Sequence, residues 1–231
     1  MKRVAILQSN YIPWKGYFDL LSMVDEFIVF DSAQYTKNDW RNRNQIKSAN
    51  GKVWLTVPVR HRGMGQAIDE VELSEPRCFA KHWSTFRQNY AKATCIKYCE
   101  AALEPVFQSA AGLRTISEAN LHFLTAIAGL LGIDTRISNA RQYQLLEDRN
   151  DRLVSLCVQA GATHYLSGPA ARVYIDESRF ASSGITVEWA DYSGYDEYPQ
   201  PHPPFDHHVS IIDLLACTGE QAHRHLGRTT R

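Results

Sequence analysis

The sequence predicts an α/β protein built around a mainly parallel sheet. Strand-like and helix-like segments alternate over the whole chain, which is typical of sheets whose strands are joined by helices. Short apolar runs rich in β-branched residues, such as residues 3–7, have the composition of buried strands. The 231 residues, of which 44% are hydrophobic and 22% charged, are enough to bury a sizeable core. We therefore expect one layered α/β domain.

The first half of the chain opens with a strand at residues 3–7. A helix is expected over residues 14–23, where apolar side chains recur at helical spacing. A second apolar run at residues 26–30 predicts another strand, which ends at Asp31. A polar loop follows, and residues 53–59 predict a third strand of the sheet.

The second half begins with a mostly helical insertion at residues 78–131, where aromatic residues recur at spacings of three or four. Residues 192–208 are rich in Tyr, Pro and His, and their prolines predict an extended segment. One domain is expected to span residues 1–217, with residues 218–231 as a frayed tail. The other expected elements are strands at residues 135–138, 164–166 and 185–189 and helices at residues 151–160 and 209–216.

Charge and composition limit the classes of function. Lysine and arginine total 25 and aspartate and glutamate total 25, and this balance argues against a general nucleic-acid-binding protein. Five cysteines without a CxxC pair predict reduced thiols. No apolar stretch is long enough to span a bilayer, and the N-terminus lacks a signal-peptide pattern. We expect a cytoplasmic protein with a small-molecule partner, no nucleic acid and no membrane span.

The clearest local feature is a cationic segment between residues 36 and 66. Acidic residues follow it from Asp69 onwards, and Trp40, Asn42 and Asn44 lie among its cations. Because the segment follows a predicted strand, we expect it near the strand ends, where such folds bind ligands. Arginine suits phosphate or carboxylate, and neighbouring aromatic rings can clamp a nucleotide base. A solvated hairpin is the alternative interpretation. The cations are Lys37, Arg41, Arg43, Lys47, Lys52, Arg60 and Arg62.

The turn after the first predicted strand is a second candidate binding region. Gln8 and Asn10 end the strand with polar amides, and Tyr11 and Trp14 precede a helix N-terminus that can stabilise an anion. The turn has neither GxGxxG nor a P-loop, so both standard nucleotide fingerprints are absent. A packed aromatic corner is the structural alternative.

Further polar residues have both a functional and a structural interpretation. Asp31 can act as a base, bind a ribose hydroxyl or cap a loop. Ser167 beside Gly168 fits a hydrogen-bonding serine better than a nucleophile, because GxSxG is absent. His82 lies on a predicted helix, where it can be a functional group that exchanges protons or a structural residue. The spacing of the later histidines fits no zinc pattern, so we interpret them as surface residues: His202, His207, His208, His223 and His225.

Motifs spread over nearly the whole chain carry a resemblance to the WbqC-like family. Ser9 departs from the family pattern, where a proline is expected, and so does Leu7, where a histidine is common. The matching motifs are Gln8…Asn10-Tyr11-Ile12-Pro13-Trp14…Gly16-Tyr17-Phe18, Asp31…Gln34, Trp40…Asn42-Arg43-Asn44…Ile46, Trp54-Leu55-Thr56-Val57-Pro58-Val59, Lys81-His82-Trp83, Asn89-Tyr90, Tyr165-Leu166-Ser167-Gly168, Tyr174 and Ser210-Ile211-Ile212-Asp213-Leu214-Leu215.

The resemblance implies transferase chemistry. Members of the family occur in bacterial surface-polysaccharide clusters, and some have been proposed to attach glycine or another amino acid to a sugar. The order of strand, polar turn, aromatic helix, Asp31 and the Ser167-Gly168 turn is also similar to HIGH-type nucleotidylyltransferases and pantothenate synthetases, which bind ATP at the first turn. This analogy predicts a Rossmann-like sheet of the HUP/nucleotidylyltransferase type, although the paired histidines of the motif are absent.

We therefore expect an aminoacyl or acyl (glycine-type) transferase, or an ATP-dependent amide-forming enzyme, acting on an amino sugar or related amine. A non-catalytic sugar-nucleotide-binding or assembly module and a nucleotidylyltransferase are the alternatives. The expected catalytic residues are His82, as general base, and Asp31. No metal ligands are expected, and the cofactor stays open, with ATP and Mg²⁺ as candidates. The expected partner is a small-molecule substrate, for which a nucleotide or a sugar nucleotide is a candidate. The expected substrate- and anion-binding residues are Gln8, Asn10, Tyr11, Trp14, Gln34, Trp40, Asn42, Arg43, Asn44, Lys81, Ser167, Gly168 and Tyr174.

Overall fold

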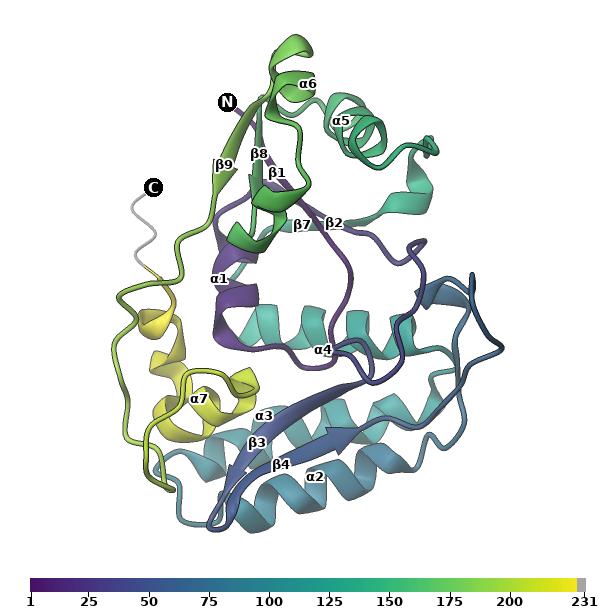
Figure 1. Ribbon diagram of the computed structural model, residues 1–231. Helices are drawn as coiled ribbons and strands as arrows, with labels where there is room; N and C mark the ends of the chain where they lie inside the picture. Colours follow the sequence, from purple (N-terminus) through teal and green to yellow (C-terminus); the bar gives the residue numbers. More distant parts are fainter. Residues whose placement is uncertain (228–231) are drawn as a thin grey trace.

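Five parallel strands form the central sheet of the computed structural model, which describes residues 1–227 (Figure 1). The spatial order is β7-β2-β1-β8-β9, and each neighbouring pair is parallel. Numbered by their succession in the chain, these strands have the order 3-2-1-4-5, the arrangement of Rossmann-like sheets. The strands are β1 (Arg3–Leu7), β2 (Glu26–Val29), β7 (Arg136–Asn139), β8 (His164–Ser167) and β9 (Thr186–Trp189).

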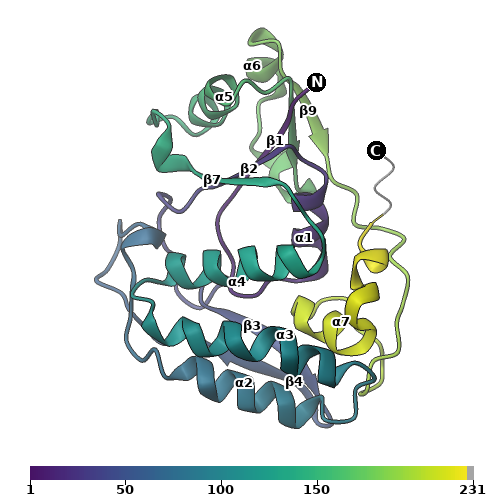
Figure 2. The same cartoon turned by 180° about the vertical axis from the view of Figure 1, so that it is seen from behind.

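Helices cover both faces of this sheet (Figures 1 and 2). On β1, Ala5 faces one core, while Val4 and Ile6 face the other. The first core contains α1 (Lys15–Ser22) and α4 (Ile116–Leu130), and the second contains α5 (Arg149–Gln159) and α6 (Glu177–Ser182). The central strands β1 and β2 are buried on both faces and are mainly apolar, whereas the edge strands β7 and β9 are partly exposed and carry polar side chains. The expected α/β fold with a parallel sheet and flanking helices is confirmed.

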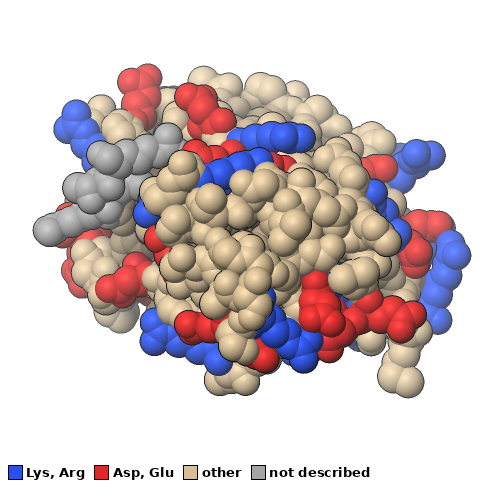
Figure 3. Space-filling view, turned by 90° about the horizontal axis from the view of Figure 1, so that it is seen from above, with Lys and Arg blue, Asp and Glu red and all other residues tan. Residues whose placement is uncertain are grey.

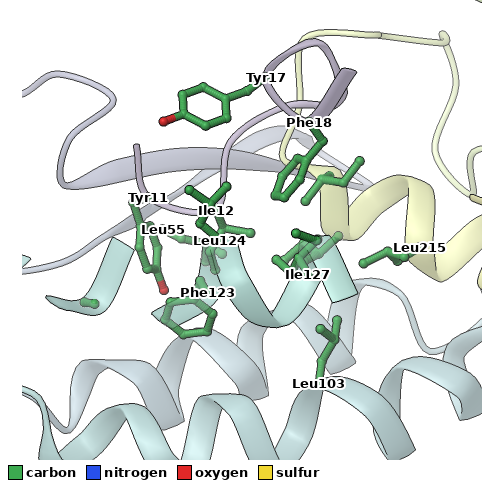
Figure 4. Packing of buried hydrophobic residues seen from close by; sticks show 14 of the residues in the cluster. Tyr11, Ile12, Tyr17, Phe18, Leu55, Leu103, Phe123, Leu124, Ile127 and Leu215 are labelled. Atoms are coloured by element: carbon green, nitrogen blue, oxygen red, sulfur yellow. The ribbon is translucent and has the colours of Figure 1, made fainter. Parts of the chain in front are cut away.

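A second layer of helices and a hairpin lies beyond α4. α2 (Cys78–Asn89) and α3 (Ile96–Ser109) fall with α4 in the segment expected to be helical, between β2 and β7. The hairpin of β3 (Arg43–Ser48) and β4 (Gly51–Thr56) contacts α2 and α7 (Ile211–Thr218) through β3. Figure 4 shows Tyr11 and Ile12 of the β1–α1 loop packed against Phe123 and Leu124 of α4. The shorter elements are β5 (Val59–Arg60), β6 (Glu72–Leu73), η1 (Ile68–Glu70), η2 (Ala110–Gly112), η3 (Ala140–Gln142), η4 (Pro169–Val173) and η5 (Gly219–His225).

The hairpin differs from the prediction. Residues 43–48, expected as part of a polar loop, form β3, and the strand expected at residues 53–59 pairs with it instead of joining the main sheet. Ile46 is the single buried apolar residue of β3, whose other side chains are polar, so its sequence lacks the pattern of a strand. The sequence also does not predict the short helix α6.

The proline-rich residues 190–208 form an extended strap, as expected, which crosses from β9 to α7 (Figure 1). Lys47 holds the strap by donating to Gln200 Oε1 at 2.8 Å and to the carbonyl of Pro204. Buried Asp213 of α7 accepts hydrogen bonds from Tyr198 Oη at 2.7 Å and Gln200 Nε2 at 2.8 Å. These side-chain hydrogen bonds hold the strap in place, because its prolines cannot donate the backbone hydrogen bonds of a sheet.

Part of the segment expected to be a frayed tail has regular structure. Residues Gly219–His225 form η5, in which Ala222 is buried. Residues 228–231 of the expected tail lie outside the described residues. No helix among residues 1–227 is long and apolar enough to cross a membrane. On the end of the molecule seen in Figure 3, basic and acidic side chains are interspersed.

Gly16 is the residue whose replacement tests the packing at the start of α1. A Cβ atom at Gly16 would lie 2.3 Å from Cζ2 of Trp14, so Gly16→Ala must displace the indole or the helix. We expect Gly16→Ala to lower the free energy of unfolding by about 1–3 kcal/mol, measured by urea denaturation. Gly129→Ala in α4 is the matched control, because nothing lies within 4 Å of its Cβ position. That variant should gain roughly 0.5–1 kcal/mol, and equal effects of the two changes would contradict the packing argument.

Candidate functional site

The candidate site lies at the carboxyl ends of β1 and β8. These strands are neighbours, but the chain leaves β1 toward β2 and leaves β8 toward β9, on opposite sides. Such a reversal of strand order opens a crevice at the carboxyl edge of the sheet, where α/β proteins bind their ligands. Gln8 follows β1 and Gly168 follows β8. The fold therefore brings both candidate turns of the sequence to the same crevice.

Arg41 is the cation that the structure places at this crevice. Its guanidinium donates hydrogen bonds to the side-chain carbonyl oxygens of both Gln8 and Asn10. The side chain is 17% exposed, and the nearest carboxylate oxygen, of Asp39, is 3.7 Å away. The two amides are neutral, so they fix the plane of the guanidinium without cancelling its positive charge. Its remaining N–H groups can donate to a bound anion. This geometry suits a bound phosphate or carboxylate.

Asp31 lies beneath Arg41 and is completely buried. Its carboxylate accepts from Ser9 N at 2.8 Å, from Ser9 Oγ at 2.6 Å and from Ser117 Oγ. Burial raises the pKa of Asp31, and the serine hydrogen bonds oppose that shift. Asn120 links this group to the next layer by donating to Ser9 Oγ and to the carbonyl of Arg41, both at 2.9 Å. Asp31 joins the ends of β1 and β2 to α4, and no ligand could reach it without displacing these partners.

The loop between β1 and α1 has an unusual backbone at Ile12. Its φ of 40° is in the left-handed region, which β-branched residues rarely adopt. The Ile12 carbonyl accepts from Asn44 Nδ2 at 2.8 Å and from Ser210 Oγ at 2.7 Å. The backbone N–H of Tyr11 donates to the carbonyl of Trp40 at 2.9 Å. The surrounding chain therefore imposes this conformation, which is common where a loop serves a binding site.

A pocket of about 180 Å³ opens beside this loop. The sequence predicts its residues Asn10, Trp14, Trp40 and Asn44, and the structure brings these together. His208, which the sequence favours as a surface residue, also lines it and is exposed. No motif marks His208, because it reaches the pocket only through the path of the strap. The complete lining is Asn10, Pro13, Trp14, Trp40, Asn44 and His208.

Trp14 is fixed by aromatic rings of the strap. The indole lies edge-on to Tyr192 and Tyr195, whose ring centroids are 5.2 and 6.1 Å from its own. It is also tilted against the His208 ring, with a centroid distance of 5.5 Å. The backbone of Trp14 also forms an antiparallel bridge with Ser210. The strap thus positions both Trp14 and His208 on one wall of the pocket, while Trp40 forms another.

His82 does not line the pocket. Its Nδ1 is 2.8 Å from Tyr11 Oη and its Nε2 is 3.1 Å from the carbonyl of Thr56. A carbonyl can only accept, so Nε2 carries the proton and Nδ1 accepts from the tyrosine. Burial lowers the pKa of His82 to about 4, assisted by the charge of Lys81. His82 is therefore a neutral ring with both nitrogens occupied, which fastens Tyr11 and β4 to α2.

Three further predicted residues lie in or next to the cationic segment. Arg43 stacks on Trp54, with its Cζ 4.2 Å from the ring centroid. Asn42 is buried and donates to the carbonyl of Val57 at 3.0 Å. Gln34 is exposed and its backbone pairs with that of Ala67.

The remaining predicted residues are divided between the crevice and the surface. Ser167 is buried at the end of β8, beside Gly168 at the crevice. Tyr174 is exposed and lies under the guanidinium of Arg149, with the Arg149 Cζ 4.8 Å from its ring centroid. Lys81 is exposed on α2. The structure therefore does not gather Lys81 and Tyr174 with the pocket residues.

Most cations of the segment serve within the protein. Lys52 pairs with Asp206 of the strap at 2.8 Å, and Arg62 pairs with Glu72 at 2.8 Å. Lys47 holds the strap and Arg43 covers Trp54, whereas Lys37 and Arg60 are exposed. The segment is thus neither a simple solvated hairpin nor a continuous anion-binding surface.

Residues 1–227 have two further features away from the pocket. No three histidine, cysteine, aspartate or glutamate side chains within this range converge as metal ligands. A larger hollow of about 460 Å³ is lined by residues that include Asp25, Asp134 and His223. It lies near the amino ends of β2 and β7, at the opposite edge of the sheet from the crevice.

The sequence profile of the WbqC-like protein family matches residues 8–225, which include every residue of the pocket. The chain belongs to the WbqC-like family. A relative in Mycobacterium tuberculosis, described as "Uncharacterized protein Rv1507c", is 45% identical over 223 residues, which are 96% of each chain. The resemblance drawn from the motifs is confirmed, and the WbqC-like family match includes both the crevice and the strap.

The neutral state of His82 can be tested through the pH dependence of stability. Its pKa is about 4 in the folded chain and 6.5 when unperturbed, so between these values only the unfolded chain binds the proton. The free energy of unfolding should therefore fall by roughly 3 kcal/mol on this account as pH falls from about 7 to 4. Urea denaturation of His82→Gln should show this contribution removed. An unchanged pH dependence in His82→Gln would mean that His82 titrates normally.

Proposed function

We propose that the chain is a biosynthetic enzyme that binds an anionic, ring-bearing activated substrate in the crevice and transfers its acyl or aminoacyl group to an amine. The position of Arg41 carries this proposal. A guanidinium oriented by two amides, at the point where strand order reverses, can hold the phosphate or carboxylate of a substrate.

The pocket supports a ring as the other part of the substrate. Trp14 and Trp40 supply indole surfaces, and Asn10 joins the pocket to Arg41. A volume of about 180 Å³ is below the usual size of a site for a whole drug-sized ligand. It suits one ring of the substrate, with the anionic group extending to Arg41. A nucleotide or sugar nucleotide has this combination of ring and phosphate.

His208 contributes the imidazole among the pocket residues, and imidazole nitrogens are the commonest proton acceptors in general-base catalysis. In acyl transfer the amine nitrogen attacks the carbonyl carbon, a C–N bond forms, and the bond to the leaving group breaks. The nitrogen then loses a proton, for which His208 is the acceptor in this proposal. The positive charge of Arg41 stabilises the negative charge on the leaving phosphate or carboxylate. Asp31 and His82 support the site from below instead of touching the substrate.

A non-catalytic sugar-nucleotide-binding module is the second candidate. One observation favours it: both groups expected from the sequence to be catalytic, Asp31 and His82, are buried and fully hydrogen-bonded. The Rossmann-like strand order is compatible with a nucleotidylyltransferase, although this sequence lacks the paired histidines of that motif. Turnover by the purified protein separates the enzyme from the binding module, and release of pyrophosphate would indicate nucleotidyl transfer.

Arg41→Ala tests the anion site. Thermal unfolding of the wild-type chain should shift upward with ATP, UDP or a sugar nucleotide, and a ligand at a hundred times its Kd adds about 2.7 kcal/mol. Removal of a charge-assisted bidentate contact should weaken binding about 10–100-fold in Arg41→Ala. Arg60→Ala is the matched control, since Arg60 is an exposed cation of the same segment. Equal ligand shifts in both variants would contradict the assignment of Arg41.

His208→Ala tests the proton acceptor separately. Because Tyr192 and Tyr195 still contact Trp14 when the His208 ring is removed, we expect ligand-induced stabilisation to change little while the rate of acyl transfer falls about 100-fold. The measurement is single-turnover formation of the amide, with an aminoacyl adenylate as the acyl donor and an amino sugar as the amine. A His208→Ala enzyme with the wild-type rate would exclude the residue as the proton acceptor.

A further inference from the structure

Two tryptophans form an exposed aromatic surface next to the pocket. Trp40 is 44% exposed and Trp54 is 41% exposed, and their ring centroids lie 5.7 Å apart with planes inclined by 37°. Trp40 is also a wall of the pocket, so this surface continues the pocket outward. We call Trp40 and Trp54 together the shelf. Large aromatic side chains exposed side by side are unusual on a protein surface and mark interaction sites.

The hairpin contributes Trp54 to the shelf and places polar residues beside it on its outer face, while Trp40 precedes β3. Trp54 lies directly opposite Gln45, and Thr56 lies opposite Arg43, in the register of β3 and β4. Successive side chains of a strand point to opposite faces, so these four residues share one face. The guanidinium of Arg43 covers one side of the Trp54 ring, with its Cζ 4.2 Å from the centroid. An apolar indole surface is thus bordered by an amide, a hydroxyl and a guanidinium.

The strap covers only one end of this face. Lys47 and Lys52 lie on the same face, further along the hairpin, and both bind the strap, through Gln200 and Asp206. The shelf lies between this covered end and the pocket. It is therefore a defined uncovered area whose two borders are the strap and the crevice.

Buried polar atoms on and near Arg43 have no hydrogen-bond partner. They include Arg43 Nε, Asn42 Oδ1 and the Tyr35 hydroxyl, and Tyr35 is only 2% exposed. Tyr35 is in contact with His61, whose ring centroid is 5.1 Å away. Buried polar groups of this kind are normally completed by water or by a polar ligand. Of these atoms, Arg43 Nε lies on the side chain that borders the shelf.

We propose that the shelf is the acceptor subsite of the enzyme and that it binds a saccharide ring by stacking on Trp40 and Trp54. This inference rests on the proposed function, in which the activated donor occupies the pocket. A saturated ring with hydroxyls offers an apolar C–H face to the indoles and polar edges to Gln45, Thr56 and Arg43. The shelf is open and one-sided, so it cannot enclose the hydrogen-bonding edge of a nucleobase. An amine on the bound ring would face the pocket across Trp40.

The test uses the full chain and N-acetylglucosamine, its β1,4-linked disaccharide and glucosamine as probes, with uridine as the comparison ring. Saturation-transfer NMR and titration of tryptophan fluorescence should both detect the sugars. Trp54→Leu should weaken sugar binding about tenfold, the effect of losing a ring-stacking contact of the usual strength. Trp189→Leu is the matched control, because Trp189 also lies against an arginine, Arg172, but on β9. Gln45→Ala should weaken the binding of the sugars without affecting the binding of uridine.

The outcomes separate this inference from the proposed function. Sugar binding that is lost in Trp54→Leu and kept in Arg41→Ala would support the shelf, even if no anionic ligand binds. Absence of sugar binding in a wild-type chain that still shows Arg41-dependent anion binding would overturn the shelf and leave the proposed function intact. Stronger binding of uridine than of sugars at Trp54 would also overturn it. Self-association in sedimentation experiments that Trp54→Leu abolishes would assign the shelf to a contact between copies of the chain.

Discussion

The loop between β1 and α1 is the constraint on which the site depends. It runs between the sheet and the helical layer, where Tyr11 and Ile12 are buried, so its backbone polar groups must find partners inside the protein. Asn44 and Ser210 supply them at the Ile12 carbonyl and hold a residue at a φ of 40°. The same loop ends in Asn10 on one side and Trp14 on the other. Fixing the loop therefore fixes both Asn10, which orients Arg41, and Trp14, which lines the pocket.

Buried charges in this protein connect layers. Asp31 joins the sheet to α4 through Ser9 and Ser117, and Asp213 joins α7 to the strap. Removing a partner from such a buried carboxylate leaves a desolvated charge, which destabilises the fold strongly. Lys47 acts similarly by holding the strap from β3. Asp31, Asp213 and Lys47 therefore bind other parts of the protein, and their polar groups are not available to a ligand.

The strap gives the site a wall that the central sheet could not provide. It leaves β9 at the carboxyl edge, crosses to α7 and brings Tyr192, Tyr195 and His208 around Trp14. Its prolines cannot join a sheet, so side-chain contacts determine its path. The pocket consequently combines residues of the first strand turn, the hairpin and the last quarter of the chain.

Sequence alone determined the sheet and its two-sided cover, because short apolar runs and helical periodicity report local burial directly. It also identified Asn10, Trp14, Trp40 and Asn44, since polar amides and aromatics at strand ends are informative without partners. The strand β3 escaped prediction because its polar residues are buried by contacts with distant segments such as Tyr90 and the strap. Only the tertiary structure showed that Arg41 reaches the crevice, that Arg43 covers Trp54 and that His208 enters the pocket while His82 does not. Each of those outcomes depends on contacts between residues far apart in the chain, for which local pattern carries no signal.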